Sequence, residues 1–499
     1  MNNEEDIKFE NYIKGEAKLN SEKQYIIESS CRFNANNDNF KRHYDENKIL
    51  EIHLNNMVFE QDLSFDNVKK LSLIIDDNVK FQKLYIFGCN ELSLRINGRV
   101  KIIDKISINN CKFKQISINN HIDGNIEFQN CEFNDFNLYG FSNATIKGTF
   151  TFDFCEVKEK VNFMNFEFEN KVSFKMSKFK DNVYFNNSVF KDYADFHECE
   201  FEKIACFYGV RFDKTPNFSQ AIFKGNLNVV NTNLNFTFDD LQERIKQEYT
   251  SYETQRTAKE AGVIPNLYQE KSLDKFANDF RDSFRTFKNA LIKDNNALDA
   301  SNFHKCELYC KEIELKNKKY KTLKDKMDKW QLIFYRKLCD HHTDILQSLN
   351  SLILVIGIFV ISSVAMVVGF SYSLGYKPIL EHWYFSLDFY NHHINSIIQD
   401  NCLLMIFVNL MILFIYLGLV GFALCIKYMR EFFIIISYVI TLLVLAISPK
   451  ILIPAMGIFT DKRAMLDPLS VLGGIYTIIF GFVAFSFIKT IRKNSIVPS

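Results

Sequence analysis

Two short stretches of the chain place histidine beside cysteine, the residue types that bind transition metals. The first contains His304, Cys306 and Cys310, whose two thiols are four residues apart and share one face of a helix. The second contains Cys339 and His342 just ahead of a long apolar run. A structural zinc site needs four converging ligands at a recognisable spacing, and neither stretch supplies them. We expect packing residues in the first and a membrane-interface position for the second, with metal binding or pH sensing as the alternative.

Other reactive side chains are scattered. The solitary His121 and His197 have no serine or aspartate partners at a catalytic spacing, and the sequence contains no phosphate-binding glycine loop and no HExxH motif. We therefore expect no catalysis, no cofactor and no metal. The 12 cysteines do not form a disulfide framework, and no export signal precedes them, so we expect reduced thiols. The repeat region described next includes Cys111, Cys131, Cys155, Cys199 and Cys206.

The strongest pattern is a phenylalanine repeat. The chain has 50 Phe in 499 residues, and between 163 and 223 they recur at steps of five and six residues without exception. The repeat consists of Phe163, Phe168, Phe174, Phe179, Phe185, Phe190, Phe196, Phe201, Phe207, Phe212, Phe218 and Phe223.

A second position, two residues before each Phe, holds a small or apolar residue such as Val161 or Ser188. Residues at i−2 and i of an extended segment point to the same face. Turn-forming residues follow each pair, so a square coil closes after about four short sides. Each Phe should then stack on the Phe 22 residues earlier, as in the series Phe163, Phe185 and Phe207. This pattern predicts a β-solenoid with a phenylalanine core.

The motifs CKF at 111–113, CEF at 131–133 and SVF at 188–190 resemble the pentapeptide-repeat family. The resemblance implies a right-handed quadrilateral β-helix. The preference for Phe over Leu and the six-residue side depart from the plain repeat and resemble the Phe-rich branch of the family. Some soluble members mimic DNA, which requires a strongly negative surface. Residues 48–235 contain 24 acidic and 23 basic side chains, so we expect neither DNA mimicry nor nucleic-acid binding.

The pattern divides the chain into four parts. We expect an N-terminal cap at 1–47, a β-helix at 48–236 and a helical hairpin and neck at 237–347. Within the hairpin, the sequence DNNALD predicts a turn, after which Asp299 or Ser301 is the N-cap of the second helix. We expect a membrane domain at 348–493, with nearly charge-free spans at 352–374, 402–426, 432–453 and 469–488. The third reaches the required length only if it extends toward Pro454.

Flanking cations orient these spans. By the positive-inside rule, we expect a multi-pass protein of the cell inner (cytoplasmic) membrane with its β-helix and both termini in the cytoplasm. An outer loop contains the cations Lys450, Lys462 and Arg463, which favour the opposite orientation. Trp383 indicates that the 375–401 loop lies at the membrane interface. The topology-setting residues are Arg336, Lys337, Lys427, Arg430, Lys489, Arg492 and Lys493, of which Lys427 and Arg430 are expected in a loop.

Two functions are compatible with this organisation. The first is a membrane-anchored scaffold, whose β-helix binds a protein partner that the sequence does not identify. The second is an oligomeric ion channel or transport component, although no TVGYG-like filter is present. The polar residues expected inside the spans are Asn409, Ser437 and Thr441, which helix-to-helix hydrogen bonds would also explain. Gly473, Gly474 and Gly481 are expected to allow close packing of helices.

Overall fold

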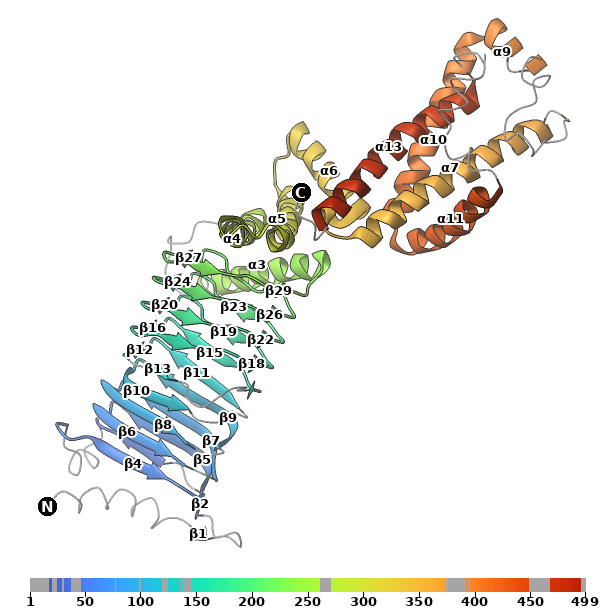
Figure 1. Ribbon diagram of the computed structural model, residues 1–499. Helices are drawn as coiled ribbons and strands as arrows, with labels where there is room; N and C mark the ends of the chain where they lie inside the picture. The colour runs from blue at the N-terminus through green and yellow to red at the C-terminus, as the bar shows by residue number, and fades with distance from the viewer. Residues whose placement is uncertain are drawn as a thin grey trace. The chain divides into compact units, whose positions relative to one another are not determined.

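The computed structural model describes residues 18–19, 25–28, 31–36, 46–76, 78–97, 100–118, 124–134, 136–137, 145–260, 271–373, 375, 392–393, 395–447 and 467–494. Trp383 and most of the expected 375–401 loop, the loop at 448–466 and His121 lie outside these residues. The chain forms two compact units, Met1–Lys321 and Thr322–Ser499. The first contains every strand and the helices up to Asn317; the second contains the remaining helices (Figure 1).

The first unit is a parallel β-solenoid, as the repeat predicted (Figure 1). Two long sheets run along the whole stack. Sheet A contains β1 (Lys18–Leu19), β2 (Tyr25–Ile27), β3 (Cys31–Asn34), β5 (Met57–Asp66), β7 (Val79–Phe87), β9 (Val100–Asn109), β11 (Asn125–Gln129), β15 (Phe150–Asp153), β19 (Val172–Ser173) and β23 (Ala194–Asp195). Sheet B contains β4 (Leu50–Leu54), β6 (Lys70–Ile75), β8 (Glu91–Ile96), β10 (Lys112–Ile118), β12 (Glu132–Phe133), β13 (Phe136–Asn137), β16 (Glu156–Val157), β20 (Lys178–Phe179), β24 (Glu200–Phe201) and β27 (Ile222–Phe223).

Two shorter sheets complete the four-sided coils of the second half. Sheet C contains β14 (Thr145–Ile146), β18 (Glu167–Phe168), β22 (Val189–Phe190), β26 (Arg211–Phe212) and β29 (Asn233–Leu234). Sheet D contains β17 (Val161–Asn162), β21 (Val183–Tyr184), β25 (Ala205–Cys206) and β28 (Leu227–Asn228). Successive strands of one sheet pair 22 residues apart here, as in Val172 with Ala194. In the first half, long strands such as β5 bend at a register shift between Phe59 and Asp62 and so cover more than one side.

The phenylalanine side chains stack with the 22-residue period predicted from the sequence. Phe185 lies parallel to Phe163 and to Phe207, with ring centroids 5.0 Å apart in both cases. Phe190 stacks in the same way, 4.8 Å from Phe168 and 5.0 Å from Phe212. Rings from different columns meet edge-on. The interior therefore gains aromatic contact energy in addition to the burial of apolar surface.

The predicted cap at 1–47 already contains solenoid strands. β2 and β3 both pair in parallel with β5, and Cys31 and Phe33 belong to the common core. β1 pairs with β2 in antiparallel direction, the one antiparallel pair among the described strands. This reversal places a different strand at the exposed edge of sheet A, where an unprotected parallel strand could pair with another chain.

The corners of the coils explain the small residue at i−2. Every eleventh residue from Phe154 to Asn231 has a left-handed backbone, and a residue no larger than valine follows it directly, except at Asn165, which Phe166 follows. Ser188 is one example: its hydroxyl donates to Phe163 O and accepts from Phe166 N–H, at 2.5 and 3.0 Å. The side chain thus satisfies two backbone groups of the coil below that the turn leaves outside the strand ladders. Serine, threonine and cysteine can all fill this role.

Three helices close the C-terminal end of the solenoid: α3 (Phe238–Glu260), α4 (Leu273–Lys293) and α5 (Ala297–Asn317) (Figure 1). Phe287 of α4 contacts Phe207, Phe218 and Phe223 of the last coils. One continuous hydrophobic core therefore runs from the strands into the helices. The N-cap of α5 is Asn296, whose side chain accepts from the backbone N–H of Asp299, and not Asp299 or Ser301 as expected, because the helix begins one turn earlier.

The second unit contains α6 (Leu323–Cys339), the short 3-10 helix η1 (Asp340–His342), α7 (Ile345–Ser373), α9 (Asn395–Asp400), α10 (Cys402–Cys425), α11 (Lys427–Ile447) and α13 (Pro468–Asn494). Within the described residues, four of these helices, α7, α10, α11 and α13, are long and apolar enough to cross a membrane. Half of the most apolar window of α7 is buried inside the unit, against 17% for α10 and α11, so α7 is the central helix.

The third span differs from its prediction. The prediction that Lys427 and Arg430 lie in a loop was wrong. Only Ile426, which has an extended backbone, separates α10 from α11, and both cations lie in the first turn of α11. The helix therefore extends the predicted span on its N-terminal side, and the predicted extension toward Pro454 lies outside the described residues. The predicted neck at 237–347 is also divided, because α3, α4 and α5 belong to the solenoid unit and α6 to the second unit.

Candidate functional site

The outer faces of the solenoid carry rows of ion pairs between successive coils. Lys178 contacts Glu200 and Glu202 at 3.2 and 3.1 Å, and Lys203 contacts Asp181 at 3.0 Å. Because positive and negative side chains alternate along each row, these rows do not create a large electrostatic potential of one sign. Such pairs contribute little stability at an exposed surface, but they order the polar side chains that a partner would meet.

One corner between sheets A and B departs from this polar surface. Phe154 and Met176 occupy successive left-handed positions there, with φ of 57° and 54°, and remain 47% and 37% exposed. The other row of left-handed corners contains Asn165, Asn187 and Gly209 instead. Asparagine and glycine adopt this backbone easily, whereas bulky residues do so at an energetic penalty. The two exposed apolar side chains therefore occupy backbone positions that do not favour them.

A buried acidic cluster lies where α3 meets sheet A. The Tyr193 hydroxyl donates to Glu248 at 2.6 Å, and the Arg244 guanidinium stacks 3.7 Å from the Tyr193 ring. Asp195 accepts from the backbone N–H of His197 at 2.9 Å. Burial, together with the nearby Glu248 charge, raises the pKa of Asp195 to about 7. The cluster can therefore bind a proton near neutral pH.

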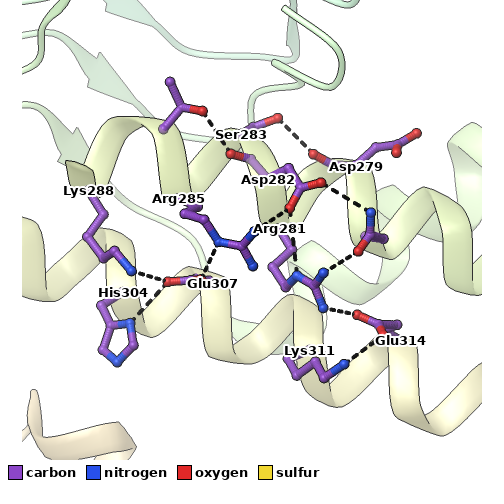
Figure 2. A network of polar contacts seen from close by, with 12 residues as sticks. Asp279, Arg281, Asp282, Ser283, Arg285, Lys288, His304, Glu307, Lys311 and Glu314 are labelled. Atoms are coloured by element: carbon purple, nitrogen blue, oxygen red, sulfur yellow. Dashed lines mark hydrogen bonds and ion pairs between the residues drawn. The ribbon is translucent and has the colours of Figure 1, made fainter. Parts of the chain in front are cut away.

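An ion-pair network connects α4 to α5 (Figure 2). Glu307 accepts from Arg285 at 2.9 Å, Lys288 at 2.7 Å and His304 at 3.1 Å. Two helix turns further along α5, Glu314 forms ion pairs with Arg281 and with Lys311 (Figure 2). Burial acts to raise the pKa of Glu307, but the three donors outweigh it and hold that pKa at about 2. This carboxylate is therefore saturated with protein partners.

The side chains of the first predicted Cys–His stretch, which contains His304, Cys306 and Cys310, do not point toward a common position. Cys306 and Cys310 are buried in the hydrophobic core, while His304 faces the ion-pair network on the opposite side of its helix. Among the residues that the structure describes, no group of three or more His, Cys, Asp or Glu side chains could hold a metal ion.

Cys111, Cys131, Cys155 and Cys199 form a column at one corner, before successive strands of sheet B, whereas Cys206 lies on β25 of sheet D. Cys89, which sequence reasoning did not single out, joins it, and its backbone N–H donates to Cys111 Sγ at 3.4 Å. Cys199 Sγ donates to Phe174 O at 2.8 Å, as the serines of the same position do. Burial raises the pKa of Cys89 to about 12, so its thiol stays protonated and is a poor nucleophile. The column is therefore a structural feature of the corner.

The side chains of the second predicted stretch, Cys339 and His342, lie close together at the turn between α6 and α7. Cys339 Sγ lies 3.4 Å from His342 Nδ1, which is also 3.0 Å from the Thr490 hydroxyl of α13. Three consecutive residues, Asp340 to His342, have left-handed backbones. Burial, with Lys489 and Lys493 nearby, lowers the pKa of His342, so the imidazole is neutral at pH 7. The arrangement connects the α6–α7 turn to the end of α13.

The expected topology-setting cations gather at this end of the second unit. Arg430 donates to the Ser351 hydroxyl at 3.2 Å, and Ser351 in turn donates to Leu338 O at 2.8 Å. Lys493 donates to His341 O at 3.5 Å. The remaining members lie in the last turn of α6, the first turn of α11 or the last turns of α13: Arg336, Lys337, Lys427, Lys489 and Arg492.

The interior of the second unit contains polar side chains from α10 and α11. Ser437, Thr441 and Asn409 are all buried. Within the described part of the chain, the hydroxyl oxygens of Ser437, Thr441 and Tyr416 have no hydrogen-bond partner. The hydrogen bonds expected for Ser437 and Thr441 are therefore absent there; α11 is joined to α7 instead by the bond from Arg430 to Ser351 and by the Tyr438 hydroxyl, which donates to Asn350 at 2.9 Å.

The glycine prediction was wrong for two positions. A Cβ added to Gly474 or Gly481 would meet no atom within 4 Å, so neither glycine allows a close approach. Gly357 has that role: an added Cβ would lie well inside 3.0 Å of Ser437 Oγ and Cβ. Gly357 on α7 therefore permits the closest approach of α11, beside the buried Ser437 hydroxyl.

Sequence reasoning missed the network in Figure 2 and the acidic cluster for different reasons. Arg281, Arg285 and Lys288 are spaced four and three residues apart on α4, and Glu307 and Glu314 are seven apart on α5. This complementary helical charge pattern could have indicated the network. The contact of Tyr193 with Glu248 joins residues 55 apart in different kinds of element, and no periodic signal announces it.

Comparisons with protein-family models, with curated proteins and with solved structures give no match for this chain.

Proposed function

We propose that this chain is a membrane-anchored scaffold: a solenoid of the pentapeptide-repeat type that binds a protein partner, without catalysis, at the cytoplasmic side of the cell inner membrane. The observation that carries this proposal is the continuous core that joins the stacked coils to the α3–α5 cap. A rod closed in this way presents long, ordered faces, and such faces are the usual binding surfaces of solenoid proteins. The four apolar helices supply the anchor.

The cytoplasmic orientation rests on the cations around the α6–α7 turn. Because the described topology-setting cations lie at one end of the second unit, the positive-inside rule assigns that end, and with it both termini and the β-helix, to the cytoplasm. Protease protection of inverted and right-side-out vesicles tests this directly. Digestion of the solenoid in right-side-out vesicles would contradict it.

The corner with Phe154 and Met176 is the surface on which partner binding is best tested. A photo-crosslinking amino acid at Met176 should give a partner adduct in cells, whereas the same amino acid at Asn187, on the other corner row, should not. The double variant Phe154→Asn and Met176→Asn should retain the fold, because asparagine suits the left-handed backbone. With the photo-crosslinking amino acid placed at a third position, Lys175, this variant should lose the partner adduct. Equal adducts from both corners would contradict a specific platform.

A second function is favoured by one observation, the buried hydroxyls of Ser437, Thr441 and Tyr416 within the membrane unit. Polar groups inside a membrane domain are typical of transport pathways. We infer an oligomeric ion channel or transport component as the alternative. It predicts ion flux in liposomes containing the full chain, and the double variant Ser437→Ala and Thr441→Val should reduce that flux. The scaffold predicts no flux and partner adducts that persist when residues 350–490 are deleted.

A further inference from the structure

Helix α6 exposes a stripe of large apolar side chains immediately before the first membrane span. Leu323, Met327, Trp330 and Phe334 are 79%, 72%, 67% and 38% exposed. At 3.6 residues per turn, their spacing of four, three and four residues places them within about 60° of arc on one side of the helix. Soluble surfaces rarely expose such a contiguous apolar patch, which marks a site of association.

The charges of α6 are arranged around this stripe. Lys324 and Lys326 flank it on either side, Asp325 falls on the opposite side of the helix, and Lys329 and Asp328 lie equally far round, one on each side. Lysine side chains beside an apolar stripe can extend their ammonium groups to lipid phosphates while their methylene chains cover apolar surface. An apolar stripe flanked by two lysines, with Asp325 turned away from it, is the pattern of a helix that binds an anionic membrane surface.

The helix is well formed and continuous with the membrane spans. A capping box at Thr322 and Asp325 closes its first turn. At its other end, Phe334 lies 5.7 Å from Phe482 of α13, ring centroid to ring centroid, and Phe482 is part of a membrane span. The stripe therefore begins where a membrane span lies and extends about 16 Å along the helix to Leu323. Lipid is the surface that continues from the spans at this position.

We propose that α6 is an interfacial helix that binds the anionic lipid leaflet next to the α6–α7 turn, with Leu323, Met327, Trp330 and Phe334 inserted among the acyl chains. Lys324 and Lys326 then contact the phosphate groups. Tryptophan prefers the level of the headgroups, which is where such a helix places Trp330. The proposal rests on the membrane spans and does not depend on whether the solenoid binds a partner or the spans conduct ions.

Intrinsic fluorescence can test this contact in the full chain, because the sequence contains only 2 tryptophans, Trp330 and Trp383. The variant Trp383→Phe leaves Trp330 as the sole reporter. We would reconstitute it into nanodiscs of phosphatidylcholine, alone or mixed with phosphatidylglycerol, with bromine placed either high or low on the acyl chains. We expect blue-shifted emission, stronger quenching by the shallow bromines than by the deep ones, and less quenching by aqueous iodide once phosphatidylglycerol is present.

The double variant Lys324→Gln and Lys326→Gln should lose the dependence on phosphatidylglycerol, whereas Lys112→Gln and Lys171→Gln, with the same change of charge on the solenoid, should keep it. Water-like emission that iodide quenches and bromolipids do not would overturn the proposal. Shielding that occurs only in discs holding two copies, without bromolipid quenching, would also overturn it and identify a second chain as the occupant. Bromolipid quenching that is equal in both lipid mixtures would rule out the anionic preference.

Discussion

The ring of Phe287 on α4 meets the ring of Phe218 edge-on, with centroids 4.7 Å apart and planes 66° apart. Phe218 is the last ring of a column in which Phe196 lies parallel to it at 4.5 Å. The helix thus contributes the side chain that another coil would have supplied. A stacked β-solenoid must end somewhere, and its last coil would otherwise expose apolar rings and strand edges to water.

Removing this side chain should destabilise the end of the solenoid. Phe287→Ala would leave a cavity against three rings of the last coils, and such a change typically lowers the free energy of unfolding by about 3–5 kcal/mol. Hydrogen exchange of the amides in β26, β27 and β28 should accelerate, while that of β6 and β8 should change less. Ile292→Ala, at a half-exposed position of the same helix, serves as the control. Equal exchange in the two variants would show that α4 does not cap the coils.

The corner hydrogen bonds predict which substitutions the small position accepts. Ser177 donates to Phe152 O at 2.6 Å and accepts from Cys155 N–H at 2.9 Å. Ser177→Ala would leave both backbone groups buried without a partner, which typically lowers the free energy of unfolding by about 1–3 kcal/mol. Ser177→Cys should be tolerated better, because Cys199 makes the corresponding bond one coil later. Denaturant unfolding of both variants measures the difference, and an alanine variant as stable as the cysteine variant would contradict this role.

The buried acidic cluster predicts a pH dependence of stability. Asp195 has a pKa of about 7 in the folded chain, against about 3.9 for an unfolded aspartate. Between these values the folded state holds a proton that the unfolded state has released, so the stability contributed by this group falls as pH rises from about 4 to about 7. The groups around it are Glu248, Lys175, Asp153 and His197. Asp195→Asn should flatten this slope, measured as the thermal midpoint against pH.

His197 provides the control for that experiment. Burial lowers the pKa of His197, so its own contribution has the opposite sign and stability rises with pH around the histidine pKa. His197→Gln should therefore steepen the fall that Asp195 causes and leave the effect of Asp195→Asn in place. A wild-type midpoint that rises steadily between pH 4 and 7, unchanged by Asp195→Asn, would show that Asp195 is not held protonated.

The two glycines of the membrane helices should respond differently to alanine. In Gly357→Ala the new methyl group would collide with Ser437, and overpacking of this kind typically costs about 1–3 kcal/mol. In Gly474→Ala the methyl group would meet open space, and alanine should favour the helix slightly. The folded fraction in detergent, followed by size-exclusion chromatography and resistance to proteolysis, compares the two. Equal loss in both variants would contradict the close approach of α7 and α11.

Much of the fold could be predicted from the sequence because its contacts repeat. In a solenoid the partner of each core residue lies one coil away, so the spacing of Phe163, Phe185 and Phe207 specifies both the strands and their stacking. The membrane spans were predictable for a different reason: bilayer thickness sets the length of an apolar helix, and composition alone reveals it. Their ends were less predictable, since Lys427 and Arg430 lie inside α11 and not in a loop.

The remaining features depend on contacts that follow no period. The packing of Phe287 on the last coil, the bond from Tyr193 to Glu248 and the approach of Gly357 to Ser437 each join elements whose relative placement only the tertiary structure decides. Local sequence reports which side of a helix or strand is apolar, but not which element covers it. The stripe on α6 shows this limit: its residues and spacing are visible in the sequence, and only the folded unit reveals that the unit's own described helices leave Leu323, Met327 and Trp330 exposed.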